Sequence, residues 1–205
     1  MRTAPDEHVD RTVTATSDYP IVLFADRAAF RKWLSAHHAE QPGLWLRIAK
    51  AASPLQSVTY AEALDVALCF GWIDGQKKSH DAESFLQKFT PRRERSSWSK
   101  RNREHVERLI AAGEMHPAGL GAVAAAKADG RWDRAYDSAG TATVPDDFQA
   151  ALDAHPEARA FFATLKGANR YAILYRIQTA VKPETRARRI AEFVAMLQRR
   201  ETLHP

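Results

Sequence analysis

The sequence predicts an α+β fold, with a small antiparallel sheet and two helices in the N-terminal half and a helical bundle at the C-terminus. The apolar pattern has a period near two up to about residue 90 and a period near 3.6 after Pro91. Prolines at 145, 156 and 183 stand where helices would begin, and each precedes an apolar stripe. The 205 residues, 45% of them hydrophobic, suffice to bury a core.

The N-terminal half alternates strand-forming runs with helix-start signals. Asp26 is placed to cap a helix with an apolar face, and Thr59 with Glu62 forms the capping-box pattern of a second helix. The second pair of strands flanks a short polar turn and predicts a hairpin. The expected strands cover residues 21–24, 44–48, 73–77 and 84–90.

Helical periodicity dominates after Pro91. A helix is expected from Ser99 to Gly113, and another begins at Pro117 and ends at Gly130. The first of these helices is expected to bury Asn102, Val106, Leu109 and Ile110. The pattern divides the chain into a mobile tail at 1–18, an α+β domain at 19–135, a linker at 136–144 and a helical region at 145–205.

Charge is distributed unevenly along the chain. The whole chain carries a net charge of +5, while residues 88–108 carry +5 and residues 182–200 carry +4, so the remainder is net acidic. Two basic segments on an acidic body indicate contact with anions. Nucleic-acid binding is one alternative, because the sequence pI is about 9.5.

The strongest local signal is the basic segment at residues 89–102, where a predicted strand ends and a helix begins. It offers guanidinium groups suited to oxyanions, hydroxyls and a tryptophan beside helix-terminal N–H groups. The structural alternative is a solvated basic loop whose Trp98 anchors the next helix. Together with a glycine-flanked turn at residues 70–75, this segment gives the candidate ligand-binding residues Trp72, Asp74, Lys78, Arg92, Arg93, Arg95, Ser96 and Trp98.

Several residues invite a chemical role that their context makes less favourable. Trp72 and Asp74 could equally be a core residue and a turn residue. Cys69, the single cysteine, follows Asp65 by one helical turn, and a carboxylate there disfavours the thiolate, so a structural thiol is expected. His37 and His38 are adjacent on a helix and point about 100° apart, so no metal site is predicted.

Three sequence blocks carry a resemblance to a known family. Residues 59–75 (TYAEALDVALCFGWIDG), 89–99 (FTPRRERSSWS) and 182–190 (KPETRARRI) resemble the bacterial YdeI/OmpD-associated family, also called the OmdA or bacteriocin-protection family. The resemblance extends over about residues 19–205. It implies a bacterial protein whose family label points to porin association and protection from bacteriocins, and it supplies no catalytic residues.

We therefore expect a non-enzymatic binding protein for an anionic small molecule or an acidic protein surface. The alternatives are a non-specific nucleic-acid-binding protein and an enzyme that uses Asp65, Asp74 or His80. No cofactor or metal is predicted. The sequence contains no apolar run of membrane-spanning length and no apolar stretch typical of a signal peptide, so the expected location is the cytoplasm.

Overall fold

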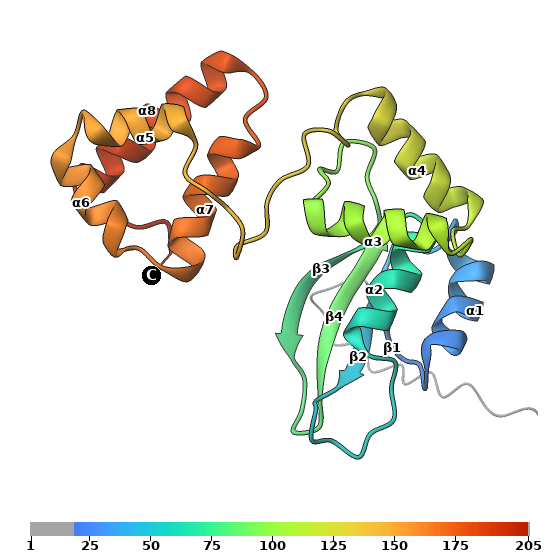
Figure 1. The fold of residues 1–205 in the computed structure, drawn as a ribbon. Helices are drawn as coiled ribbons and strands as arrows, with labels where there is room; N and C mark the ends of the chain where they lie inside the picture. Colours follow the sequence, from blue (N-terminus) through green and yellow to red (C-terminus); the bar gives the residue numbers. More distant parts are fainter. Residues whose placement is uncertain (1–18, 205) are drawn as a thin grey trace, which may run out of the picture. The chain divides into compact units, whose positions relative to one another are not determined.

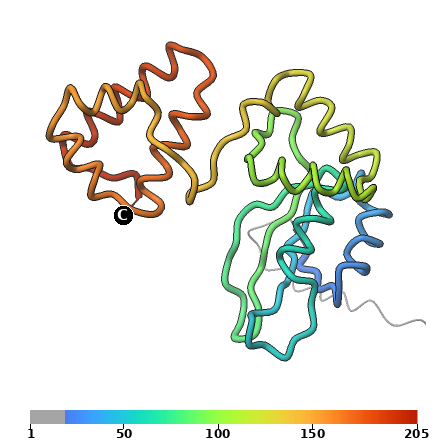
Figure 2. The backbone as a smooth tube through the Cα atoms, in the orientation of Figure 1, coloured from blue at the N-terminus to red at the C-terminus, as the bar shows by residue number. Residues whose placement is uncertain are grey.

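The computed structural model describes residues 19–204, so the predicted tail at 1–18 lies outside the described residues. Figure 1 shows helices and a sheet along the first part of the chain and helices alone along the last part, and Figure 2 traces the same path. The chain divides into two compact units. Of the described residues, the first unit comprises 19–96 together with 104–130, and the second comprises 97–103 and 131–204.

The first unit is built on a mixed four-stranded sheet with the order β1-β2-β4-β3. Strands β2, β4 and β3 are antiparallel, with Trp45 opposite Lys88 and Lys78 opposite Leu86. The prediction of an antiparallel sheet was wrong for β1, which pairs with β2 in parallel. A helix between β1 and β2 returns the chain to the same end of the sheet, so the second strand runs in the same direction as the first. The bounds are β1 Ile21–Leu23, β2 Leu44–Ala49, β3 Trp72–Ser79 and β4 Ser84–Pro91.

Helices α1 (Arg27–His37) and α2 (Tyr60–Cys69) begin at the predicted caps. Asp26 accepts a hydrogen bond from the Ala29 N–H at 2.8 Å. Thr59 and Glu62 form the complete capping box. Because side chains alternate along a strand, one face of the sheet presents buried residues to these helices. Phe30 of α1 and Phe89 of β4 meet on that face, with ring centroids 5.9 Å apart.

Helices α3 (Lys100–Ala111) and α4 (Pro117–Ala128) follow the sheet. The buried face of α3 includes Asn102, Val106 and Leu109 as expected, but the prediction for Ile110 was wrong because this side chain is 40% exposed. Ile110 is rotated about 100° from Leu109 and falls outside the buried stripe. Gly119 of α4 packs so tightly on α2 that an added Cβ would lie 2.2 Å from the Cys69 carbonyl oxygen.

Four further helices in the second unit confirm the predicted C-terminal bundle. Pro156 and Pro183 occupy first-turn positions as expected, whereas Pro145 immediately precedes its helix as the N-cap residue. Their buried faces form one core that includes Phe148, Phe162 and Ile177. The bounds are α5 Asp146–Asp153, α6 Pro156–Thr164, α7 Gly167–Gln178 and α8 Pro183–Gln198.

Candidate functional site

The predicted site residues Trp72 and Asp74 both lie on β3 and face the helices. The indole of Trp72 is 1% exposed, and its Nε1–H donates to the His38 carbonyl at 3.1 Å. The Asp74 carboxylate accepts a hydrogen bond from the Tyr60 hydroxyl at 2.8 Å. Trp72 thus belongs to the core, while Asp74 fastens the start of α2 to the sheet.

Residues 92–96, which we call the arginine loop, form a tight turn directly after β4. The Arg92 N–H donates to the Gly71 carbonyl at 2.9 Å, which places the loop beside the glycine-flanked turn. The Arg93 N–H donates to Ser96 Oγ at 3.1 Å, and the Ser96 N–H returns a bond to the Arg93 carbonyl at 2.9 Å. Arg93 and Arg95 are exposed, so their charges face solvent.

Trp98 is a core residue of the second unit. It is 2% exposed and meets Trp132 edge-on, with ring centroids 5.0 Å apart. The candidate set therefore includes two buried indoles, and its charged members occupy the arginine loop and β3. Whether these residues bind a ligand together stays a prediction.

A pocket lined by lysines lies where β2, β3 and β4 approach the hairpin turn. Its volume is about 420 Å³, which is within the range of small-molecule sites. We call it the lysine pocket. It is lined by Lys50, Ala51, Lys77, Lys78, Ser79 and Phe85.

Strand alternation separates the two neighbouring lysines of β3. Lys77 Nζ lies over the Phe85 ring, 4.1 Å from its centroid, and Lys78 Nζ lies over the Trp45 ring at the same distance. Phe85 of β4 pairs with Ile48 of β2, and Ile48 is three residues from Trp45 on the same strand. Because side chains alternate along a strand, Phe85 and Trp45 point to opposite faces of the sheet. The Lys77 ammonium group therefore belongs to the Phe85 side of the pocket, and the predicted residue Lys78 holds its charge on the other face.

Lys50 supplies a second ammonium group at the same end of the sheet. Its Nζ donates to the carbonyl oxygens of Asp81 and Ala82 at 2.6 and 3.3 Å. Among residues 19–204, neither Lys50 nor Lys77 pairs with a carboxylate. The pocket thus contains two cations whose charge is not neutralised by an acidic side chain.

The acidic residue of the hairpin turn is already occupied by other donors. The Asp81 carboxylate accepts bonds from the Ser84 hydroxyl and N–H at 2.7 Å and from Arg47 at 2.8 Å. These bonds lower the pKa of Asp81 to about 2, and the hydrogen bond from the Ser84 side chain has the largest effect. Asp81 therefore organises the turn and leaves only its main-chain carbonyl to Lys50.

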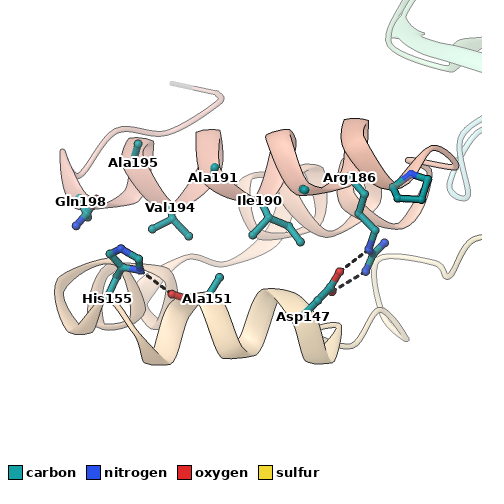
Figure 3. A pocket seen from close by; sticks show the side chains of 11 residues that line it. Asp147, Ala151, His155, Arg186, Ile190, Ala191, Val194, Ala195 and Gln198 are labelled. Atoms are coloured by element: carbon teal, nitrogen blue, oxygen red, sulfur yellow. Dashed lines mark hydrogen bonds and ion pairs between the residues drawn. The ribbon is translucent and has the colours of Figure 1, made fainter.

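The second unit contains a separate apolar groove of about 670 Å³ between α5 and α8. Figure 3 shows the two helices side by side, with small and aliphatic side chains such as Ala151, Ala191 and Val194 between them. One end holds the ion pair of Asp147 and Arg186, at 2.6 and 2.8 Å. The hydrogen bond from Arg186 lowers the pKa of Asp147. His155 and Gln198 lie at the other end of the groove.

The residues of the enzyme alternative each have a different partner. Asp65 accepts bonds from His105 at 2.7 Å and from Arg108 at 2.6 and 2.7 Å, and these lower its pKa against the opposing effect of burial. Asp74 is bound by Tyr60, and His80 lies 3.8 Å from Asp81 at the hairpin turn. The Asp65 cluster joins α2 to α3.

A cluster of aromatic and basic groups surrounds the start of α4. The His116 ring stacks on Phe70 with centroids 4.7 Å apart and meets His38 at 4.8 Å. The Arg31 guanidinium lies over the Phe70 ring, 5.5 Å from its centroid. His116 Nδ1 accepts a hydrogen bond from the Ala118 N–H at 3.2 Å and so caps the helix. Burial, together with His38 and Arg31, lowers the pKa of His116.

The described chain has neither a metal-binding cluster nor a membrane-spanning helix. No group of three or more His, Cys, Asp or Glu side chains within residues 19–204 is arranged to hold a metal ion. In the same range, no helix combines the length and apolarity needed to cross a membrane.

Sequence reasoning missed Lys50, Lys77 and Phe85 of the lysine pocket. Their positions are separated by up to 35 residues in the sequence, and only the β2–β4–β3 register brings them together. The available signal was the predicted hairpin at residues 73–90, which already placed Lys77 and Phe85 on neighbouring strands.

Two known family models match separate parts of the chain. Residues 22–122 match a model described as a domain of unknown function (DUF8412), and residues 141–200 match the family described as "Bacteriocin-protection, YdeI or OmpD-Associated", OmdA. The resemblance inferred from the sequence is thus confirmed for the C-terminal part, whereas the blocks at 59–75 and 89–99 fall within the other match. No curated protein and no solved structure matches the chain.

Proposed function

We propose that this chain, whose residues 141–200 match the OmdA family, is a non-enzymatic protein that binds an anionic ligand in the lysine pocket of its first unit. The supporting observation is the pair of ammonium groups of Lys50 and Lys77, which line one pocket and pair with no carboxylate in the described chain. We place this activity in the cytoplasm as part of the proposal.

The energetics favour an anion over the present partners of Lys77. A cation over an aromatic ring at an exposed site contributes about 0.5–1 kcal/mol, whereas a hydrogen bond to a charged group contributes about 1.5–3 kcal/mol. The interaction free energy of the Lys77 ammonium therefore becomes more favourable when a phosphate or carboxylate enters the pocket. Lys50 retains a third N–H donor beyond the two that it gives to Asp81 and Ala82.

The test measures the thermal midpoint of the full chain with inorganic phosphate and citrate. A ligand that binds only the native state raises the midpoint, and one at 100 times its Kd adds about 2.7 kcal/mol of stability. We expect stabilisation of the wild type and none in Lys50→Gln/Lys77→Gln. Glutamine removes the charge and keeps a donor for the carbonyls of the hairpin turn.

Lys32→Gln is the matched control, because Lys32 is an exposed lysine of α1 in the same unit and lines no part of the pocket. It should respond to anions as the wild type does. If no anion raises the midpoint, or if the double variant responds fully, the proposal fails.

A second arm tests the arginine loop as the anion site. Arg92→Ala/Arg95→Ala removes two of the predicted ligand-binding arginines while leaving the lysine pocket complete. Under our proposal this variant keeps its response to anions. A response lost in this variant and kept in the lysine variant assigns anion binding to the loop at residues 92–96 instead.

A further inference from the structure

The lysine pocket has an aromatic wall next to its charge. Phe85 lines the pocket at the start of β4, and the Lys77 ammonium lies 4.1 Å from the centre of its ring. Any anion bound by Lys77 is therefore placed beside an aromatic face. Ala51, two residues after the end of β2, adds a second apolar surface.

The donors of the pocket match a single phosphate or carboxylate group. Lys77 and Ser79 are two residues apart on β3 and so lie on the same side of the strand. Their ammonium and hydroxyl groups, with the remaining donor of Lys50, supply a small number of polar contacts at one end of the sheet. A volume of about 420 Å³ leaves room for a larger group beyond that anion.

From this arrangement we infer that the ligand joins an aromatic ring to a phosphate, as nucleotides do. The inference rests on the proposed function and specifies its ligand class. The phosphate takes the donors of Lys50, Lys77 and Ser79. In doing so it draws the Lys77 ammonium away from the face of Phe85 that it covers in this structure, and the ligand ring stacks on the face so exposed. Stacking on an aromatic side chain is open to every base, because each base presents a π-face.

The experiment compares adenosine monophosphate with ribose 5-phosphate by calorimetric titration of the full chain. The two probes share the phosphate and the sugar, and only the first has a ring system. Stacking of one base contributes enough to raise affinity about tenfold, so adenosine monophosphate should bind about tenfold more tightly. Phe85→Leu should remove most of this difference, and a circular dichroism spectrum and thermal transition like those of the wild type show that the variant is folded.

The possible failures are distinguishable. Equal affinity of the two probes overturns the ring-phosphate inference and leaves the anion site standing. Binding of neither probe by the wild type, together with no response to phosphate or citrate, overturns both proposals. Full binding of adenosine monophosphate by Phe85→Leu also contradicts the inference, because the ring would then lie elsewhere.

A further arm distinguishes a free nucleotide from a nucleic-acid strand as the source of this chemistry. Single-stranded oligonucleotides of five and fifteen bases are titrated beside adenosine monophosphate. Either source supports the ring-phosphate class. An affinity that rises with strand length identifies a strand, whereas tighter binding of the mononucleotide identifies a free metabolite.

Discussion

Cys69 occupies the last position of α2 and has no exposed surface. Burial raises the pKa of its thiol, against the opposing effect of Arg31. Sequence reasoning expected an unreactive thiol because of Asp65, but that carboxylate is directed to His105 and Arg108. The physical cause is therefore the apolar surroundings rather than a neighbouring charge, which a helical spacing alone does not reveal.

The thiol of Cys69 should react slowly in the native protein. We expect a thiol reagent such as dithiobis-nitrobenzoate to modify it at least tenfold more slowly in buffer than in denaturing urea, since only the exposed thiolate reacts. Cys69→Ser should lower the denaturant midpoint, because it buries a hydroxyl. Native labelling at the rate of the unfolded chain would contradict this account.

His116 gives the first unit a pH-dependent helix cap. Its Nδ1 accepts the Ala118 N–H and must therefore be unprotonated. Arg31 of α1 and His38, which directly follows α1, face the same ring. The Cys69 thiol and Phe70 lie at the end of α2, and Glu114 is engaged by Arg27 and Arg31. A charged imidazolium at the start of α4 would also oppose the helix dipole.

Acidification should weaken the first unit through this residue. The pKa of His116 is lowered by folding, so its contribution to stability is complete above its ordinary pKa near 6.5 and is lost as the pH falls below that value. We expect a larger loss of unfolding free energy between pH 7.5 and 5.5 in the wild type than in His116→Asn, which keeps a cap without titrating. Equal losses in the two proteins would exclude this role for His116.

The helix starts at Asp26 and Thr59 were predictable because a cap is decided by residues within one turn. The parallel pairing of β1 with β2 was not, since a three-residue apolar run carries no signal for its neighbour. Two of the candidate site residues, Trp72 and Trp98, illustrate the same limit. A tryptophan beside glycines or arginines has the same sequence pattern in a core as at a binding site, and only tertiary packing distinguishes the two.

Trp98 anchors the segment that leads into α3. Its indole is nearly fully buried against Trp132, and its carbonyl accepts the Tyr136 N–H at 2.9 Å. Trp98→Ala should cost about 3 kcal/mol or more in urea unfolding, as for other buried large aromatics. Arg95→Ala, three residues earlier and exposed, should change stability by less than about 0.5 kcal/mol. A similar effect of both substitutions would argue against the anchoring role.

The ion pair between Arg186 and Asp147 ties α8 to α5 at one end of the apolar groove. Both groups are partly exposed, so the pair contributes at most about 1 kcal/mol. Arg186 also donates to the Ile177 carbonyl at 2.8 Å. Arg186→Gln should therefore lower the free energy of unfolding by about 1 kcal/mol, and less in 1 M salt. In Arg188→Gln, where the pair with Glu192 spans 3.7 Å at an exposed site, almost no change is expected.

On the scale of the whole molecule, the local charges of +5 at residues 88–108 and +4 at residues 182–200 overstate the cationic surface available to a polyanion. Many cations of the two basic segments already face carboxylates. The pairs that the structure contains include Lys100 with Asp137, Arg108 with Asp65, Arg186 with Asp147, Arg188 with Glu192 and Arg199 with Glu201.

Contacts with nucleic-acid backbones outside the lysine pocket should therefore be weak and non-specific. We expect fluorescence anisotropy with a labelled 20-base strand to show affinity at 20 mM salt that falls steeply by 200 mM, because each neutralised phosphate releases counterions. The slope should be insensitive to Phe85→Leu, which changes no charge. Tight binding that persists at 200 mM salt would instead favour a dedicated nucleic-acid interface.

The two edges of the sheet bear on how the protein behaves when it is concentrated. Within residues 19–204, β1 and β3 are the edge strands. β1 has only three residues, and β3 has an irregular register between Asp74 and Lys77, followed by exposed lysines. Short, irregular and charged edges are poor templates for strand addition by a second chain. Lys77 and Lys78 are thus charged edge residues of the kind that oppose such addition, and valine at both positions should make this edge more prone to self-association.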